Sequence, residues 1–482
     1  MSLPDLLLDA AREAPDRPAV ITPTETVTFA ELVARVEARA AQVCERTGPG
    51  ERVAVLAENC VGYVELYYAV PLAGRVLVPL NHRLHPEEWS RTMVRAGVQV
   101  LYAARPYADR VVDDRDVARL DLSPAPASKF QAPPRADDDV AWLIGTSGTT
   151  GDPKLAMLTD ASLVAAVDAT LGARPVGPHD TLLTPFPLCH VAGYNVMVLH
   201  RRARPVVLQP TFDAVQLARM VREHAVTMLS LAPTMIAMLL DQPDVDDADL
   251  GTVRALGYGA SPIPGPVLRR VVERWDWDCS QGFGMTELSG NAIFLGPDEH
   301  RAAARGDERL LVSAGRAAPG VEVRLGDRDE LLVRAPQVMR GYWEDPDATA
   351  AAIDAEGWLH TGDVARLDDD GIVTIVDRTK DIIVSGGENV ASREVEEVLH
   401  GHPAVRDVAV IGLPDERWGE IVTAVVVRRH DVTADELIAH CRTQLAGFKS
   451  PKRIEFVDDL PRTASGKVRK HELRTDLTAG AT

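Results

Sequence analysis

The sequence predicts an α/β protein with a large N-terminal domain and a small α+β C-terminal domain. A chain of 482 residues is too long for one hydrophobic core, so two or three domains are expected. Up to about residue 325, short apolar runs alternate with helical stretches, which is typical of parallel sheets with crossover helices. A Pro- and Ala-rich link, Leu122–Arg135, separates two such blocks. We therefore expect two α/β subdomains in the N-terminal domain.

The first block begins with an amphipathic helical pattern, and its clearest helix is expected over Ala30–Cys44. Leu32, Val36 and Val43 lie on its apolar stripe, and Thr28 is a suitable N-cap. Further along, a helix over Glu65–Ala73 is expected between two strands. The strands expected in this block are Arg52–Ala57 and Val76–Leu80.

The second block repeats the alternation. After the expected strand Val140–Ile144, further short apolar strands are expected at Thr181–Leu183, Pro205–Gln209, Val226–Ala232 and Arg254–Tyr258. Three prolines then precede an expected helix at Val267–Trp275. Loops at the carboxyl ends of such strands are where ligands bind in open α/β sheets.

From Gly320 to Asp377 the pattern changes to short strands and turns, which indicates a β subdomain. A domain boundary is expected near Asp377–Lys380, giving domains 1–377 and 381–482. In the last domain we expect helices at Arg393–His400 and Ala434–Leu445 and strands at Val408–Ile411 and Ile421–Val427.

Composition excludes several classes of function. The net charge of −19 argues against general attraction to nucleic acid or to anionic membranes. The start of the chain lacks the basic and apolar regions of a signal peptide, and no apolar stretch is long enough to span a bilayer, so an intracellular, cytoplasmic protein is expected. The five cysteines lack paired spacing, which argues against disulfides and zinc. One segment, Arg442–Arg474, has a local charge of +5 and suits a surface that closes over phosphates.

The most informative motif is Ile144-Gly-Thr-Ser-Gly-Thr-Thr-Gly-Asp-Pro-Lys154, a strand followed by a loop rich in glycine and hydroxyl residues. Its glycines permit backbone N–H groups to point into one concavity, and its hydroxyls and lysine add donors for anionic oxygens. The glycine-to-lysine spacing differs from that of the Walker A loop. A phosphate site of another kind is expected.

Four further motifs carry reactive side chains. Gln281-Gly-Phe-Gly-Met-Thr-Glu287 places a carboxylate beside a hydroxyl, which suits a divalent cation on phosphate oxygens. Trp358-Leu-His-Thr-Gly-Asp363 places an aspartate where it could accept both hydroxyls of a ribose. A charged turn and a two-glycine turn follow in Asp377-Arg-Thr-Lys-Asp-Ile-Ile-Val-Ser-Gly-Gly-Glu388, and Pro461-Arg-Thr-Ala-Ser-Gly-Lys467 carries a lysine on a turn.

These five motifs, in this order over nearly the whole chain, resemble those of the adenylate-forming superfamily: acyl- and aryl-CoA synthetases, nonribosomal peptide adenylation domains and luciferase. Ser385–Asn389 and Asp415–Glu420 are most similar to bacterial fatty acyl- or aryl-CoA ligases. The resemblance implies that the two α/β subdomains are stacked and that the C-terminal domain is mobile. Its hinge is expected at residues 378–380, with Lys380 at the hinge position.

The resemblance also implies roles for individual residues. The triphosphate would be held by Thr146, Ser147, Gly148, Thr149, Thr150, Gly151 and Lys154. The adenine would be flanked by Gly259 and Ala260, with Phe283 stacked on its ring. Gly282, Gly284 and Met285 would also belong to the ATP- or AMP-binding site. The ribose would be held by Asp363 and Arg378. The catalytic group would comprise Lys467, Thr286 at the α-phosphate and Glu287 as the Mg²⁺ ligand. Coenzyme A would be contacted by Gly386, Gly387, Glu388, Trp418 and Phe448.

The implied reaction joins ATP, Mg²⁺ and a carboxylic acid to form an acyl-adenylate, and then transfers the acyl group to coenzyme A. The acid pocket would include His190, Tyr194, Asn195 and Gly257. Its apolar neighbours favour a fatty or aromatic acid, and the lack of arginine in Ser280–Phe283 disfavours a dicarboxylate.

The acceptor could also be an amine or a carrier protein, or the enzyme could activate nitrite for N–N bond formation. A nucleotide-binding regulatory protein without catalysis is a further possibility, which the presence of Lys467, Glu287 and Asp363 disfavours. Leu155, Asp160 and Cys189 depart from the residues usual in the superfamily, although none removes a residue that adenylation needs. The acid's identity, a homodimeric state and the pathway are left open.

Overall fold

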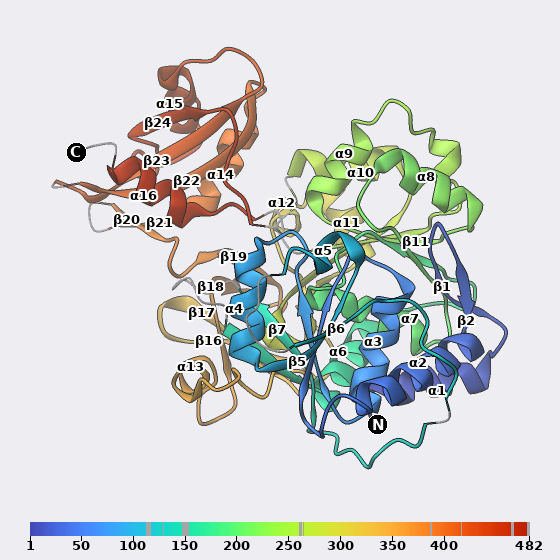
Figure 1. Cartoon of the computed structure of the whole chain (residues 1–482). Helices are drawn as coiled ribbons and strands as arrows, with labels where there is room; N and C mark the ends of the chain where they lie inside the picture. The colour runs from blue at the N-terminus through green and yellow to red at the C-terminus, as the bar shows by residue number, and fades with distance from the viewer. Residues whose placement is uncertain are drawn as a thin grey trace. The chain divides into compact units, whose positions relative to one another are not determined.

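The computed structural model describes residues 1–111, 117–128, 130–146, 154–259, 263, 265–385, 388–415, 417–463 and 467–479 (Figure 1). The chain forms two compact units. Unit 1 comprises residues 1–262, 269–323 and 333–359, and unit 2 comprises residues 263–268, 324–332 and 360–482. The domain limits expected from the sequence, 1–377 and 381–482, stay a prediction. No helix in the described part of the chain is long and apolar enough to cross a membrane.

Two sheets form the framework of unit 1. Over the described residues, the larger has nine strands in the order β15-β14-β13-β12-β11-β9-β10-β1-β2. Its strands are β1 (Pro18–Ile21), β2 (Thr26–Thr28), β9 (Leu182–Thr184), β10 (Val206–Leu208), β11 (Met228–Leu231), β12 (Ala255–Gly259), β13 (Asp278–Met285), β14 (Gly290–Leu295) and β15 (Arg316–Ala317). The run from β1 to β13 is parallel, as the sequence alternation predicts.

The second sheet of unit 1 has six strands in the described ranges, in the order β6-β5-β3-β4-β7-β8. They are β3 (Arg52–Leu56), β4 (Val76–Leu80), β5 (Val98–Ala103), β6 (Ala118–Leu120), β7 (Val140–Thr146) and β8 (Lys154–Thr159). Strands β7 and β8 pair antiparallel at the edge, whereas the others run parallel.

The α-helices up to residue 352 are α1 (Leu3–Glu13), α2 (Phe29–Cys44), α3 (Val61–Leu72), α4 (Pro86–Ala96), α5 (Arg105–Ala108), α6 (Asp160–Ala173), α7 (Asn195–His200), α8 (Ala214–Glu223), α9 (Pro233–Leu240), α10 (Gly265–Arg274), α11 (Pro297–Ala304), α12 (Glu308–Leu311) and α13 (Pro346–Ala352). Short 3₁₀ helices are η1 (Val191–Tyr194), η2 (Asp247–Leu250) and η3 (Thr286–Leu288).

Local chemistry explains where these helices begin. The Thr28 side chain accepts a hydrogen bond from the backbone N–H of Glu31, whose carboxylate accepts from the Thr28 N–H at 2.8 Å. This capping box fixes the start of α2. Helix α3 begins at Val61, earlier than the expected Glu65, and every one of its residues is buried. A helix packed on all sides has no polar stripe from which its ends can be predicted.

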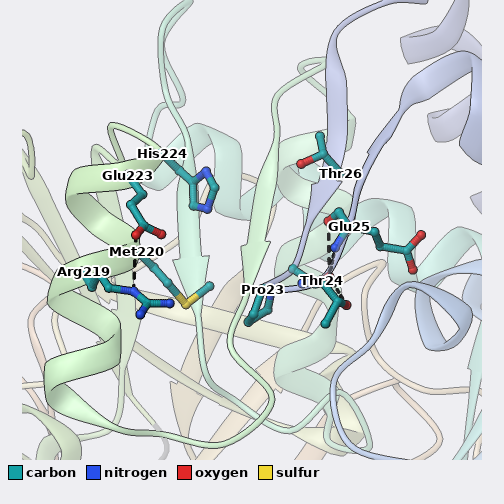
Figure 2. A pocket seen from close by; sticks show the side chains of 9 residues that line it. Pro23, Thr24, Glu25, Thr26, Arg219, Met220, Glu223 and His224 are labelled. Carbon is teal, nitrogen blue, oxygen red and sulfur yellow. Dashed lines mark hydrogen bonds and ion pairs between the residues drawn. The ribbon is translucent and has the colours of Figure 1, made fainter.

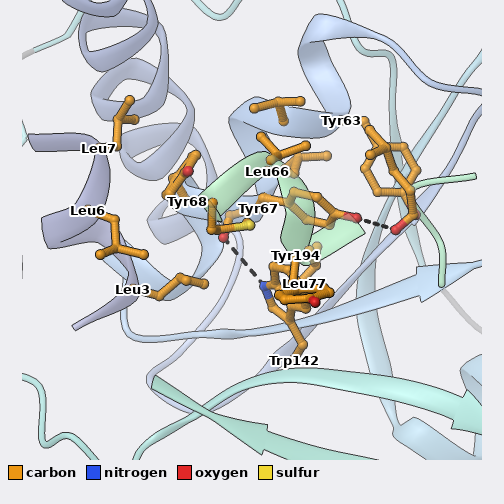
Figure 3. Close-up of a cluster of buried hydrophobic side chains, with 14 of the residues drawn as sticks. Leu3, Leu6, Leu7, Tyr63, Leu66, Tyr67, Tyr68, Leu77, Trp142 and Tyr194 are labelled. Carbon is orange, nitrogen blue, oxygen red and sulfur yellow. Dashed lines mark hydrogen bonds between the residues drawn. The ribbon is translucent and has the colours of Figure 1, made fainter. Parts of the chain in front are cut away.

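A continuous hydrophobic core surrounds α3 (Figure 3). The rings of Tyr67 and Trp142 stack at a centroid distance of 4.4 Å, and Leu3 and Leu6 of α1 belong to the same core. Tyr194 also belongs to this core. The core therefore reaches from the N-terminal helix to the segment expected to form the acid pocket.

Unit 2 contains most of a four-stranded sheet, in which β18 and β19 pair antiparallel, followed by a sheet with helices on both faces. The first sheet has the order β16 (Glu322–Leu325), β17 (Glu330–Arg334), β18 (Leu359–Leu367) and β19 (Val373–Arg378), with η4 (Asp327–Asp329) between β16 and β17. The second comprises β20 (Ile383–Ser385), β21 (Glu388–Val390), β22 (Val405–Asp415), β23 (Gly419–Arg428) and β24 (Arg453–Val457).

Alternating residues of β22 and β23 serve two cores in unit 2. Val408 and Val410 pack with helices α14 (Ser392–His400) and α15 (Ala434–Arg442), whereas Ala409 and Ile411 pack with α16 (Lys470–Ala479). Because both faces are buried, the sequence reads as a continuous apolar run. Strand β22 extends beyond the expected Val408–Ile411 because its pairing with β23 continues from Val405 to Asp415.

Candidate functional site

The β7–β8 hairpin brings the two ends of the glycine-rich motif together. Thr146 lies opposite Lys154, and the Thr146 hydroxyl donates a hydrogen bond to the Lys154 carbonyl at 3.4 Å. The loop between them lies outside the described residues, so the structure gives no position for Ser147, Gly148, Thr149, Thr150 and Gly151. Ala260, Gly386 and Gly387 also lie outside them.

Tyr342 connects Lys154 with Glu287 inside unit 1. The Lys154 ammonium lies 5.1 Å from the centroid of the Tyr342 ring, and the Tyr342 hydroxyl donates to Glu287 Oε1 at 2.7 Å. Glu287 is buried and follows the half-buried Thr286 in η3. A cation and a carboxylate from distant parts of the chain are thus held on one aromatic side chain.

The glycines of β12 and β13 permit close approach of neighbouring backbones. A Cβ on Gly259 would lie 2.6 Å from the Gly282 carbonyl oxygen, and one on Gly284 would lie 2.0 Å from the Gly290 oxygen. These contacts alone require glycine, whether or not adenine binds there. Phe283 and Met285, between and after them, are half-buried.

A cavity of about 90 Å³ opens beside these strands. Three of the four residues expected in the acid pocket lie at or next to this cavity. Tyr194 and Asn195 line it. Gly257 lies beneath it, in the strand between those of the lining residues Ser230 and Ser280. The Tyr194 hydroxyl is 2.9 Å from Thr170 Oγ1. The half-buried His190 lies with its Nε2 3.5 Å from the Asn81 amide nitrogen.

In unit 2, Asp363 is a buried carboxylate with one oxygen unsatisfied. Its Oδ1 pairs with Arg378 Nε at 2.9 Å, whereas its Oδ2 has no hydrogen-bond partner among the described residues. Burial raises the pKa of Asp363 to about 6, and the positive charges of Arg378 and then Lys467 oppose the rise. The exposed Lys467 therefore shares an electrostatic environment with the expected ribose site.

The remaining expected residues of unit 2 are more accessible. Lys380 is exposed, two residues after the end of β19. Glu388 is exposed at the start of β21. The half-buried Trp418 ring has Lys452 Nζ 5.0 Å from its centroid, and Phe448 is 36% exposed.

A larger cavity of about 280 Å³ lies between the β1–β2 turn and α8 (Figure 2). Pro23 and Thr24 border it on one side, and on the other Arg219 pairs with Glu223 at 3.3 Å. None of the site residues expected from the sequence is among the described residues that line it.

Two side chains of the site were not expected from the sequence. Tyr342 holds Glu287, and Arg174 projects into the cavity beside Asn195. Tyr342 follows a glycine in Arg340-Gly-Tyr-Trp343, which is a weak signal for a turn. Arg174, as the residue that ends α6, gives no sequence signal for a binding role.

Two family profiles match most of the chain. The profile of "AMP-binding enzyme" matches residues 7–343, and that of "AMP-binding enzyme C-terminal domain" matches residues 394–467. A feruloyl-CoA synthase of an Amycolatopsis species is 38% identical in an alignment of 480 positions that covers 96% of each chain.

Solved structures are similar over nearly the full length. The o-succinylbenzoate CoA synthetase of Bacillus subtilis, in complex with its acyl-adenylate intermediate, has a TM-score of 0.86 and 30% identity, covering 98% of this chain and 97% of that one. The amide bond synthetase McbA of Marinactinospora thermotolerans has a TM-score of 0.89 and 29% identity, covering 99% and 100%.

Proposed function

Because the chain belongs to the AMP-binding enzyme family and is an AMP-forming acyl-CoA synthetase by its relatives, we propose a specific reaction for it. It activates a fatty or aromatic carboxylic acid with ATP and transfers the acyl group to coenzyme A. The B. subtilis relative was solved with an acyl-adenylate, which supports a two-step route through that intermediate.

The observation that carries the proposal is the unsatisfied oxygen of Asp363. A buried acceptor without a donor costs free energy, so it is retained where a ligand supplies the donor. The ribose of ATP offers two neighbouring hydroxyls, and Arg378 holds the other oxygen of Asp363 in place. We assign Asp363 and Arg378 to the ribose.

In the first step, a carboxylate oxygen of the acid attacks the α-phosphorus of ATP, and pyrophosphate leaves with the electrons of the broken P–O bond. Two anions must meet, so positive charge and positioning supply most of the catalysis. We assign Lys467 to the meeting anions and Thr286 to the α-phosphate. Lys154 and the loop that precedes it bind the β- and γ-phosphates.

Glu287 suits a Mg²⁺ ion at the same phosphates. Tyr342 occupies one lone pair of its carboxylate, and the group retains acceptor capacity for a cation. When bound, Mg²⁺ neutralises charge on the phosphate oxygens. Tyr342 then orients the carboxylate toward its ligand.

In the second step, the thiol of coenzyme A loses its proton and attacks the acyl carbonyl carbon, and AMP leaves. We assign the segment from Gly386 to Glu388 to the pantetheine. Trp418 and Phe448 suit the nucleotide end of coenzyme A because both are accessible aromatic rings, and Lys452 lies beside Trp418. The change between steps is proposed to occur by rotation at Lys380.

An amine is the second candidate acceptor. The similarity to an amide bond synthetase over 99% of this chain supports an amine. A fatty acid–[acyl-carrier-protein] ligase of Streptomyces coeruleorubidus, 34% identical over 96% of this chain, supports a carrier protein as well. An amine nitrogen would attack the same carbonyl carbon, so the adenylation site would be unchanged.

The test is acid-dependent release of pyrophosphate, followed by mass spectrometry with coenzyme A, an amine or a pantetheine carrier present. We expect pyrophosphate with an apolar acid and an acyl-CoA as the product. Adenylate without thioester would contradict the assignment to coenzyme A. Tight ATP binding with no turnover across a broad panel of acids would contradict an enzymatic function.

A further inference from the structure

One charged side chain lines the 90 Å³ cavity of unit 1, among the described residues that border it: Arg174. It follows the last residue of α6. Its Nη2 donates to Asn195 Oδ1 at 2.8 Å, and its Nε is buried without a hydrogen-bond partner. Within the described ranges, no carboxylate forms an ion pair with it. The cavity therefore contains a guanidinium whose charge none of the described residues neutralises.

The sheet beneath the cavity is shaped for this guanidinium. A Cβ on Gly257 would lie 2.0 Å from Arg174 Nη1, so only glycine leaves room for the arginine in this position. Asn195 is fixed in turn, because its amide nitrogen donates to the Ala192 carbonyl at 2.8 Å. These contacts hold the guanidinium over β12.

Strand register gives the depth of Arg174 in the cavity. Gly257 pairs with Ser230 of β11 and Ser280 of β13, whereas Gly259 pairs with Gly282. The second row is two residues nearer the carboxyl ends of the strands, about 7 Å away. Strand β13 continues from that row to Met285 and is followed in η3 by Thr286 and Glu287, where the acid is activated under the proposed function. The far end of a bound acid therefore meets Arg174.

A guanidinium without a counter-charge among the described residues, at that depth, favours a substrate that carries an anionic group. Its planar array of donors matches the two oxygens of a carboxylate, and burial without a counter-charge is costly. Ser230 and Ser280 line the same cavity and offer further hydroxyl donors.

We propose that Arg174 binds a second carboxylate at the far end of the acid, so that the enzyme activates acids with a distal anionic group. This inference rests on the proposed function and narrows its substrate class. It revises the expectation that a dicarboxylate is disfavoured, which considered arginine only within Ser280–Phe283. The structure supplies the arginine from α6, far from that motif in sequence.

The test compares cinnamic acids that carry a para-carboxylate or a para-methyl group, an anionic substituent and a smaller neutral one. We expect the kcat/KM for pyrophosphate release to be roughly 30-fold or more higher with the carboxylate. Arg174→Met keeps much of the side-chain length and removes the charge. It should bring the ratio of kcat/KM between the carboxylate and methyl acids close to one, while the methyl acid is still activated. Arg174→Lys should retain part of the preference.

Arg201→Met is the matched control. Arg201 follows α7 and pairs with Asp168 at 3.4 Å on the surface, so its loss should leave the ratio unchanged. Equal or better activity of wild type on the methyl acid would overturn the proposal, as would a ratio unchanged in Arg174→Met. If Arg174→Met does not fold, the proposal is tested by the ratio of kcat/KM between the two acids in wild type and in Arg174→Lys.

Failure of the proposed function gives a different result. In that case wild type releases no pyrophosphate with either acid or with unsubstituted fatty and aromatic acids. The assignment of Arg174 to a distal carboxylate is then wrong as well. Release with methyl or unsubstituted acids alone overturns only the Arg174 proposal.

Discussion

At the scale of single residues, Asp363 couples ligand binding to stability. Burial raises its pKa from 3.8 to about 6 despite the Arg378 ion pair. Between these values the folded protein retains a proton that the unfolded chain has lost. The free energy of unfolding therefore falls as pH rises through this window, and above it the full cost of the ionised carboxylate remains.

Asp363→Asn should remove this cost. At pH 8 we expect its free energy of unfolding to exceed that of wild type by up to about 3 kcal/mol, with the difference vanishing toward pH 4. The KM for ATP should rise, because an amide accepts ribose hydroxyls poorly. Denaturant unfolding at several pH values and steady-state kinetics check both parts. A variant less stable than wild type at pH 8 would contradict the account of Asp363.

Tyr342 offers a second test at this scale. In Tyr342→Phe the buried Glu287 loses its donor, which should lower the free energy of unfolding by about 1–3 kcal/mol. The Mg²⁺ concentration for half-maximal pyrophosphate release should also rise, since the carboxylate loses its orientation. Trp343→Phe, at the neighbouring position, is the control. An unchanged Mg²⁺ dependence would argue against Glu287 as a ligand.

At the scale of elements, α2 and α3 are joined by a buried ion pair. Arg39 Nη2 lies 2.9 Å from Glu65 Oε2, and each side chain is 1% exposed. Arg39 also donates to the backbone carbonyl of Ser123 at 2.6 Å. The pair thus connects two helices with the link between the sequence blocks.

Glu65→Ala should lower the free energy of unfolding by about 3–5 kcal/mol, because it leaves Arg39 buried and unpaired. The exposed pair of Arg12 and Asp9, at 2.6 Å, is the comparison, and Arg12→Ala should cost less than about 1 kcal/mol. Chemical denaturation measures both. Similar losses of unfolding free energy in the two variants would show that burial does not determine the cost of breaking an ion pair.

Sequence patterns placed some elements closely, whereas they misplaced the start of the buried helix α3 and missed helix α16. Strand β4 has the expected bounds, and α2 begins after its expected cap, Thr28. Helix α16 was not predicted because it contributes little to the core: among its described side chains, Leu473 alone is buried. Sequence patterns also identified only part of the candidate site. Motif residues could be named in advance, but the Tyr342–Glu287 contact joins positions 55 apart that no local pattern relates.

At the scale of the whole molecule, the proposed chemistry draws on both units. Lys154 and Glu287 belong to unit 1, whereas Asp363, Arg378 and Lys467 belong to unit 2. The chain's net charge is −19, so the positive charge that the reaction needs has to come from such individual side chains.

Lys380→Pro tests whether the two steps need different placements of residues 381–482 about the hinge expected at residues 378–380. Proline fixes its own φ and restricts the preceding residue. We expect adenylate formation to persist and thioester formation from added acyl-adenylate to fall by about tenfold or more. Lys380→Ala should be close to wild type in both half-reactions. Equal loss of both half-reactions in the proline variant would contradict a hinge role.

The most direct measurement is made on Lys467→Ala, with the two half-reactions followed separately. If Lys467 brings charge to the meeting of carboxylate and α-phosphate, acid-dependent pyrophosphate release should fall to background. The same protein should still convert synthetic acyl-adenylate and coenzyme A to thioester at a rate near that of wild type. Pyrophosphate release at the wild-type rate would contradict the account.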